Sequence, residues 1–231
     1  MSRDTKRQLF VTGTGTGVGK TWLTRGLAGA LRAQGGAVTA LKPIETGCDP
    51  DPLDAIALAA ACERPELARW PGLHRARLPL SPWAATLRGD SPYEHEAVLS
   101  TTREILANAP AGVHLVEGAG GVLVPLDQDH DILDLVRALR IPVVVVAADI
   151  LGTLSHTLTA VEACAHRGVA VRAVVMSGAS VEDDAGSNRA LLSRRLDVPV
   201  LAFTPRDDSD LARAAEPLLA PLQLTRTRPA P

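Results

Sequence analysis

Six short apolar runs, separated by segments of helical periodicity, constrain the fold of this 231-residue chain more than any other feature. The runs are rich in β-branched residues and cover residues 9–12, 37–41, 113–116, 142–147, 171–176 and 199–203. Where they are clearest, as in the consecutive valines at 143–146, they are continuous and do not alternate with polar residues. This pattern is typical of strands that are covered on both faces of a parallel sheet.

The segments between these runs have the apolar spacing of helices. They span residues 20–33, 53–61, 93–108, 132–139, 153–165 and 184–196, and a last one runs from residue 208 to about residue 219. Alternating strands and helices with right-handed crossovers predict a doubly wound α/β fold, with a mainly parallel sheet of six or seven strands and helices on both faces. The proline-rich stretch 64–92 has no clear periodicity, so we expect it to wrap over the site or the surface.

Length and composition favour one soluble domain, which we expect to cover residues 1–224, with a disordered tail at 225–231. A formal net charge of -2 and scattered arginines give no basic surface for nucleic acid. The polar N-terminus and the absence of a long apolar run exclude a signal peptide or a membrane span, and predict a cytoplasmic protein. The cysteines Cys48, Cys62 and Cys164 are far apart, and we expect reduced structural thiols.

The sequence GTGTGVGKT, residues 13–21, lies between the first predicted strand and the first predicted helix. It is a phosphate-binding loop one residue longer than the usual G-x-x-x-x-G-K-[ST], because five residues separate its first glycine from the glycine before the lysine. In such a loop the backbone N–H groups face phosphate oxygens, Lys20 bridges the β- and γ-phosphates, and Thr21 is a ligand for Mg²⁺. A dinucleotide-binding loop, G-x-G-x-x-G, needs a glycine at its sixth position. That position is Val18 when counted from Gly13 and Lys20 when counted from Gly15, so the spacing excludes this kind of loop.

Two further motifs terminate predicted strands. Lys42 begins KPIETG, and a lysine there is either a solvated charge or, beside a nucleotide loop, an ammonium group that faces the γ-phosphate. Glu117 begins EGAGG, which is the arrangement in which a carboxylate reaches the Mg²⁺ ion on a triphosphate. Asp54 lies at the start of a predicted helix. An aspartate at that position is explained as well by a helix cap as by a functional role.

Together these motifs resemble the dethiobiotin synthetases, the ATP-dependent carboxylases of biotin synthesis. The resemblance rests on GTGTGVGKT, KPIETG, Asp54 in PLDAIAL, EGAGG and LGTLSHTL at residues 151–158, in the order and spacing of that family. It implies an enzyme that joins CO₂ to 7,8-diaminononanoate and closes a cyclic urea while ATP becomes ADP and phosphate. It further implies an N7-carbamate and a carbamic–phosphoric mixed anhydride as intermediates.

The resemblance also implies a role for each matched residue. Lys42, Lys20 and Thr16 would be catalytic, and Thr21, Asp54 and Glu117 would hold Mg²⁺. The nucleotide-binding residues would be Gly15, Thr16, Gly17, Val18, Gly19, Lys20, Thr21, Glu117, Ser177 and Pro205. The diamine would be bound by Thr46, Gly118, Ala119, Gly120 and Gly121, and its carboxylate by Gly152 and Thr153 from the second subunit of a homodimer.

This chain departs from the family pattern at several positions. Gly15 stands where an aspartate is common, Ser155 where an asparagine is common, and Trp83 where a smaller or polar residue is common. Ser177 stands where an asparagine commonly binds adenine, and because a hydroxyl makes fewer hydrogen bonds to a base, we expect a weaker preference for ATP over other nucleotides.

Two other classes of P-loop protein fit the sequence less well. Amidotransferase-type synthetases of the same P-loop branch carry a glutaminase domain with a nucleophilic cysteine, for which this chain has no room. Partition-type ATPases usually carry an extra lysine early in the loop, and residues 14–16 contain none.

Overall fold

The computed structural model describes residues 7–179 and 185–225. Its centre is a six-stranded sheet in the order β2-β5-β1-β6-β7-β8, and every neighbouring pair is parallel. The strands are β1 Arg7–Gly13, β2 Val38–Leu41, β5 Val113–Glu117, β6 Val143–Ala148, β7 Val171–Ser177 and β8 Val200–Phe203. All six predicted strands are therefore confirmed.

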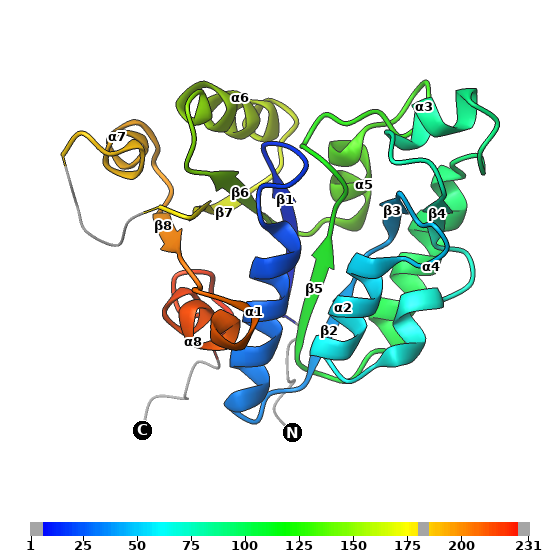
Figure 1. Cartoon of the computed structure of the whole chain (residues 1–231), viewed down its shortest axis with the longest axis horizontal. Coiled ribbons are helices and arrows are strands. Elements are labelled where there is room, and N and C mark those ends of the chain that lie inside the picture. The colour runs from blue at the N-terminus through cyan, green and yellow to red at the C-terminus, as the bar shows by residue number, and fades with distance from the viewer. Residues whose placement is uncertain (1–6, 180–184, 226–231) are drawn as a thin grey trace.

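Helices cover both faces of this sheet, as the alternating pattern predicts (Figure 1). One face packs against α1 Lys20–Ala33, α2 Leu53–Ala61, α8 Leu211–Ala215 and the 3-10 turn η3 Glu216–Leu218. The other packs against α4 His95–Asn108, α5 Ile132–Leu139, α6 Thr153–His166 and α7 Asn188–Arg195. The doubly wound α/β architecture is thus confirmed.

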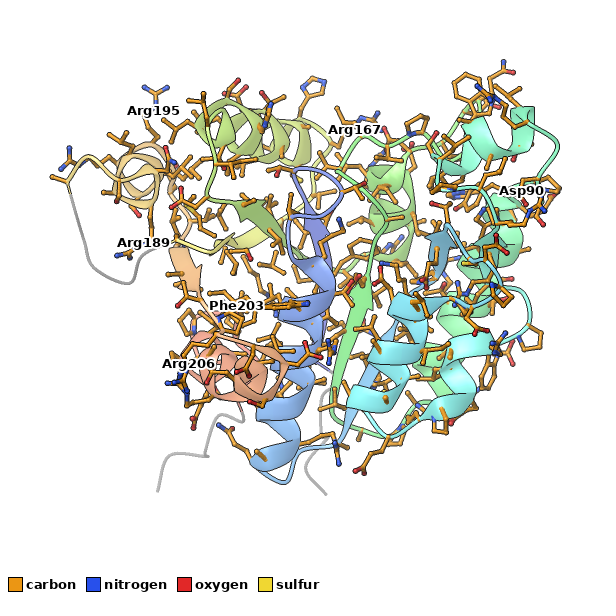
Figure 2. The ribbon with its side chains drawn as sticks, viewed as in Figure 1. Asp90, Arg167, Arg189, Arg195, Phe203 and Arg206 are labelled. Carbon is orange, nitrogen blue, oxygen red and sulfur yellow. The ribbon has the colours of Figure 1, made fainter. Side chains whose placement is uncertain are left out.

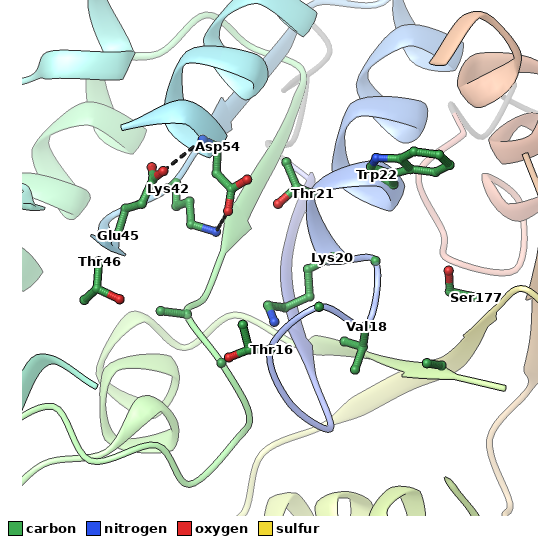
Figure 3. Close-up of a pocket in the computed structure, with 15 residues that line it drawn as sticks. Thr16, Val18, Lys20, Thr21, Trp22, Lys42, Glu45, Thr46, Asp54 and Ser177 are labelled. Carbon is green, nitrogen blue, oxygen red and sulfur yellow. Dashed lines mark hydrogen bonds and ion pairs between the residues drawn. The ribbon is translucent and has the colours of Figure 1, made fainter. Parts of the chain in front are cut away.

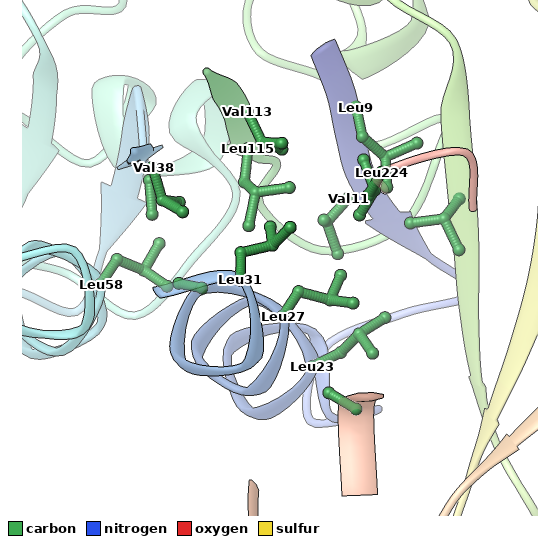
Figure 4. Packing of buried hydrophobic residues seen from close by; sticks show 14 of the residues in the cluster. Leu9, Val11, Leu23, Leu27, Leu31, Val38, Leu58, Val113, Leu115 and Leu224 are labelled. Carbon is green, nitrogen blue, oxygen red and sulfur yellow. The ribbon is translucent and has the colours of Figure 1, made fainter. Parts of the chain in front are cut away.

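Alternate residues of each strand supply the two halves of the core. In β1, Leu9 and Val11 point to the α1 face, whereas Phe10 points to the opposite face. Leu23 and Leu27, one helical turn apart on α1, pack against the first face (Figure 4). Full burial of one such side chain stabilises the fold by about 1.5–3 kcal/mol, so the two faces together anchor β1 at the centre of the sheet.

The stretch 64–92 contains regular structure that its sequence does not reveal. It forms the 3-10 turn η1 Pro65–Arg69, the strand β4 His74–Ala76 and the helix α3 Pro82–Leu87. Strand β4 pairs in parallel with β3 Ile44–Thr46, which belongs to the KPIETG motif, and makes a separate two-stranded sheet. Periodicity misses these elements because a three-residue strand and a six-residue helix are too short to show it.

Several predicted helices differ from the structure at their ends. The helix predicted for 93–108 begins at His95, and the one predicted for 153–165 ends at His166. The helix predicted for 184–196 begins only at Asn188, because the Ser187 side chain accepts a hydrogen bond from the Ala190 N–H and caps it there. Residue 184 itself lies outside the described residues. The last helix is divided into η2 Asp208–Asp210, α8 and η3, with Pro217 in the first turn of η3. The tail predicted at 225–231 lies almost wholly outside the described residues.

Several arginine side chains lie at the periphery of the molecule. Figure 2 shows Arg195 and Arg206 directed outward, while Phe203 at the end of β8 is fully buried. Arg167 links α6 to the start of α5 through ion pairs with Asp131 at 2.9 Å and Asp134 at 3.0 Å.

Over residues 7–179 and 185–225, none of the helices combines the length and apolar character needed to cross a bilayer.

Candidate functional site

The carboxyl ends of the parallel strands meet at one edge of the sheet, and a cavity of about 600 Å³ lies there (Figure 3). The phosphate-binding loop follows β1, the KPIETG segment follows β2, and Glu117 ends β5. Ala148 and Ser177 end β6 and β7. The cavity is lined by Thr16, Gly17, Val18, Gly19, Lys20, Thr21, Trp22, Lys42, Glu45, Thr46, Asp54, Ala119, Gly120, Ala148 and Ser177.

Backbone conformation favours glycine at two positions of the phosphate-binding loop, Gly17 with φ of 76° and Gly19. Gly19 precedes α1 with φ of 96°, in the left-handed region, and a Cβ built there would lie 2.6 Å from the Ser177 Oγ. Gly15 has neither constraint, because a Cβ built on it meets nothing within 4 Å. The Lys20 Nζ folds over the loop and donates a hydrogen bond to the Gly15 carbonyl at 2.7 Å.

The extra residue of the loop brings Thr16 toward the segment that follows Glu117. A Cβ built on Gly120 would lie 3.7 Å from the Thr16 Oγ1. Thr16 also lines a second cavity of about 470 Å³, together with Thr14, Gly15, Gly121 to Pro125 and the α6 residues His156, Thr159 and Ala160. One residue of the loop therefore borders both cavities.

Lys20 is buried in the first cavity, of about 600 Å³, and its ammonium group easily loses its proton. Burial and the neighbouring ammonium group of Lys42 lower the pKa of Lys20 to about 8, although the Glu117 and Asp54 carboxylates oppose the change. A lysine that has lost water and gained a cationic neighbour gains most from a bound anion, which would restore the missing favourable electrostatics.

Lys42 is the centre of a buried ionic cluster. Its Nζ donates hydrogen bonds to the Glu117 Oε1 at 2.6 Å and to the Asp54 Oδ2 at 2.8 Å, and its side chain is only 5% exposed. Burial acts to lower the pKa of Lys42, but the two carboxylates outweigh it, so the pKa lies above that of an ordinary lysine. The alternative of a solvated strand-end charge is therefore wrong for Lys42.

Thr21 completes this cluster from α1. Its Oγ1 donates a hydrogen bond of 2.7 Å to the same Glu117 Oε1 that accepts from Lys42. The other carboxylate oxygen of Glu117, Oε2, is buried and has no hydrogen-bond partner among the described residues. A buried carboxylate oxygen without a donor is free to accept a ligand.

Glu45, the glutamate of the KPIETG motif, holds the start of α2. Its Oε1 accepts a hydrogen bond from the Asp54 N–H at 2.8 Å, and its Oε2 accepts one from the Ala55 N–H at 2.9 Å. The residue in the cap position itself, Pro52, makes no side-chain cap. Interpreting Asp54 as the helix cap is therefore wrong, because Glu45 caps the helix and the Asp54 side chain faces Lys42.

Burial and hydrogen bonding compete at Glu45. Burial raises the pKa of its carboxyl group, although the two backbone N–H donors and Lys42 favour the ionised form. The sequence shows only a glutamate three residues after the strand-end lysine in KPIETG. Its burial and its contacts with α2 appear only in the folded chain.

Not every predicted site residue lines the main cavity. Gly118 is packed against Phe10, since a Cβ on Gly118 would lie 2.8 Å from the Phe10 Cε1, and Gly121 borders the second cavity. Gly152 and Thr153 begin α6 and line neither cavity. Pro205 also lies outside the lining of both.

Comparison with known proteins agrees with this geometry. A family model described as an AAA domain matches residues 7–212. The signal recognition particle receptor FtsY from Elizabethkingia anophelis has a similar fold, with a TM-score of 0.51 and 16% identity over 94% of this chain and 66% of the receptor. The fold and the loop after β1 thus define a P-loop nucleotide-binding protein.

Sequence relatives narrow this class to one family. The ATP-dependent dethiobiotin synthetase BioD of Caulobacter vibrioides (strain NA1000 / CB15N) is 43% identical over 74% of this chain and 80% of its own length. Those of Caulobacter sp. (strain K31) and Mycobacteroides abscessus are 40% and 37% identical, over 92% and 96% of this chain and 94% and 95% of their own lengths. The chain belongs to the dethiobiotin synthetases, a family of ATP-dependent ligases, as its motifs predict.

Proposed function

We propose that this enzyme carboxylates 7,8-diaminononanoate with CO₂ and closes the product to dethiobiotin, with ATP converted to ADP and phosphate. The observation that carries the proposal is the buried cluster in which Lys42 contacts both Glu117 and Asp54, in the same cavity as Lys20. Two ammonium groups beside a phosphate-binding loop suit a reaction that must bring two anions together, a carbamate and a triphosphate.

The proposed chemistry has three steps. An amine at N7 of the diamine adds to CO₂ and loses a proton, which gives the carbamate. A carbamate oxygen attacks the γ-phosphorus, the bond to the β-phosphate oxygen breaks, and ADP leaves from a carbamic–phosphoric mixed anhydride. The second amine then attacks the carbamate carbon and displaces inorganic phosphate, which closes the cyclic urea.

The residues of the main cavity have distinct parts in these steps. Lys20 would bind the β- and γ-phosphates, and Lys42 would bind both the carbamate and the γ-phosphate, reducing their repulsion as the new bond forms. Thr16 and Thr46 line the cavity. They would hydrogen-bond to the second substrate. The backbone N–H groups of the glycine-rich loop would hold the phosphates in line for the attack.

We further propose that Thr21, Asp54 and Glu117 hold Mg²⁺ on the triphosphate. Their oxygen atoms are the hard ligands that Mg²⁺ prefers, and the unpartnered Glu117 Oε2 fits such a role. Among the described residues, no cluster of three His, Cys, Asp or Glu side chains could hold a metal ion. Proteins usually bind Mg²⁺ through one or two carboxylates together with phosphate oxygens of the substrate. The ion would neutralise charge on the transferred phosphoryl group.

The diamine would lie along the segment from Gly118 to Gly121, beside Thr16 and the second cavity. We propose that its carboxylate is bound at the start of α6 of a second subunit, at Gly152 and Thr153, because a helix N-terminus favours an anion. The neighbouring Ile150 is 61% exposed and Leu151 is fully exposed, as expected for apolar side chains that a second subunit covers.

The remaining partners follow from the same proposal. Bicarbonate or CO₂ supplies the carbonyl group, and nucleotides other than ATP are expected to be accepted. We propose a cytoplasmic enzyme that binds neither nucleic acid nor membrane. We also propose that residues 1–224 form a single domain.

A coupled assay of ADP release tests the proposed function. ADP should form only when the diamine and bicarbonate are both present, and dethiobiotin should accumulate with the same stoichiometry. ADP release that ignores the diamine would remove the synthetase function. Sedimentation of the parent chain and of Leu151→Glu tests the dimer, and the variant should sediment as a monomer with weakened diamine binding.

A further inference from the structure

Trp22 is an exposed indole at the end of the main cavity that the chemistry above does not use. It is the third residue of α1, its side chain is 42% exposed, and it lines the cavity with Ser177 and Ala148. Figure 3 shows Trp22 and Ser177 on the opposite side of the phosphate-binding loop from Lys42 and Asp54. The cavity therefore has an ionic end and an aromatic end.

The face of α1 that carries Trp22 is turned away from the core. The next residue, Leu23, is fully buried against the sheet, whereas Trp22 is not part of either buried cluster. Arg25, one turn after Trp22 on the same face, pairs with Asp208 at 2.8 Å. This pair joins the Trp22 face of α1 to the segment that follows β8.

The orientation of a bound nucleotide follows from the ionic end. Lys20, Lys42 and the carboxylates mark where the γ-phosphate lies, so the ribose and base must extend from the α-phosphate toward the other end of the same cavity. In the described part of the chain, that end offers the indole of Trp22 and the hydroxyl of Ser177. A hydroxyl alone distinguishes bases poorly, while an aromatic face stacks on any of them.

We infer that Trp22 is the base-stacking residue of this enzyme and that it holds adenine, guanine and cytosine nucleotides with similar strength. The inference rests on the nucleoside triphosphate site proposed above. Stacking supplies affinity without reading the hydrogen-bonding edge of the base, so Trp22 would favour binding while leaving base selection weak.

Calorimetric titration with Mg²⁺ and each of ATP, GTP, CTP and inorganic tripolyphosphate tests this inference. The Trp22→Ala substitution should lower the affinity for each of the three nucleotides by about 5- to 150-fold, which is the range for loss of a base-stacking aromatic side chain. The same variant should bind tripolyphosphate as the parent does, because that probe has no base. Trp22→Phe should recover most of the nucleotide affinity.

Trp83→Ala is the matched control, since Trp83 is an indole of similar exposure, 37%, on α3 and outside the cavity lining. It should bind all four probes as the parent does. Equal losses for nucleotides and tripolyphosphate in Trp22→Ala would overturn the inference, as would unchanged ATP affinity or a loss confined to one base. Failure of the parent chain to bind tripolyphosphate or nucleotide would instead count against the proposed function.

Discussion

Lys42 Nζ lies 2.6 Å from Glu117 Oε1, and the Thr21 hydroxyl donates to that same oxygen from 2.7 Å. One carboxylate oxygen thus joins the strand β2 side of the cavity to the phosphate-binding loop side. The lysine proposed to bind the γ-phosphate and the threonine proposed to bind Mg²⁺ are therefore held in one hydrogen-bonded unit.

Lys42→Ala should lower turnover by at least about 100-fold, because removal of one preorganised electrostatic group typically costs that much. It should also destabilise the fold by up to about 3–5 kcal/mol, since Glu117 loses its buried partner. Steady-state ADP release and thermal unfolding measure the two effects.

The double variant Lys42→Ala/Glu117→Gln separates these effects. It removes the uncompensated charge, so the melting temperature should recover in part while turnover stays low. Near-normal turnover in the Lys42→Ala variant would show that Lys42 has no part in catalysis. Recovery of turnover in the double variant would show that Lys42 acts only on the stability of the fold.

Glu45→Ala should raise the Mg²⁺ concentration needed for half-maximal activity. The substitution leaves the Asp54 and Ala55 N–H groups without an acceptor, and loss of such a cap costs about 0.5–2 kcal/mol. Because Asp54 then loses its fixed position beside Lys42, the proposed Mg²⁺ site is loosened as well. Titration of activity with Mg²⁺ at saturating ATP measures this.

Ser187→Ala is a matched control for Glu45, because Ser187 caps α7 and does not line the cavity. It should lower stability by a similar amount with no change in the Mg²⁺ requirement. If both variants shift the Mg²⁺ requirement equally, the effect of Glu45 is one of general stability.

Affinity for MgATP should fall as the pH rises through about 8. The triphosphate binds the charged form of Lys20, whose pKa is lowered to about 8 by burial and by Lys42. One pH unit above its pKa a lysine is about one-tenth charged, so affinity should fall about tenfold between pH 7 and pH 9. Calorimetry across this range measures the effect, and Lys20→Ala should show a flat profile. A parent profile as flat as that of the variant contradicts the assignment.

Gly19→Ala and Gly15→Ala should behave oppositely. The first forces a side chain into left-handed backbone at 2.6 Å from the Ser177 Oγ, so nucleotide binding should be lost or greatly weakened. The second meets open space, so binding should be within about twofold of the parent. Titration of both variants with MgATP compares them directly, and a similar loss in both would mean that the loop tolerates no side chain at all.

Much of the fold was predictable from local pattern. The consecutive valines of β6 and the leucine spacing of α1 are enough to predict a buried parallel strand and an amphipathic helix, because both signals arise from contacts within a few residues. The short elements β4 and α3 gave no such signal. The pairing of β4 with β3 depends on residues about 30 positions apart, a contact that no local pattern records.

The sequence by itself determined the phosphate-binding loop, the family and the set of polar residues at the strand ends, because these are fixed spacings of particular residue types. Only the tertiary structure decided what those residues contact. In the folded chain, Glu45 caps α2 and Asp54 forms an ion pair with Lys42. Trp22 lies at the far end of the same cavity from Lys42. These relations join segments from different strands and helices, and burial and hydrogen bonding choose among alternatives that spacing leaves equal.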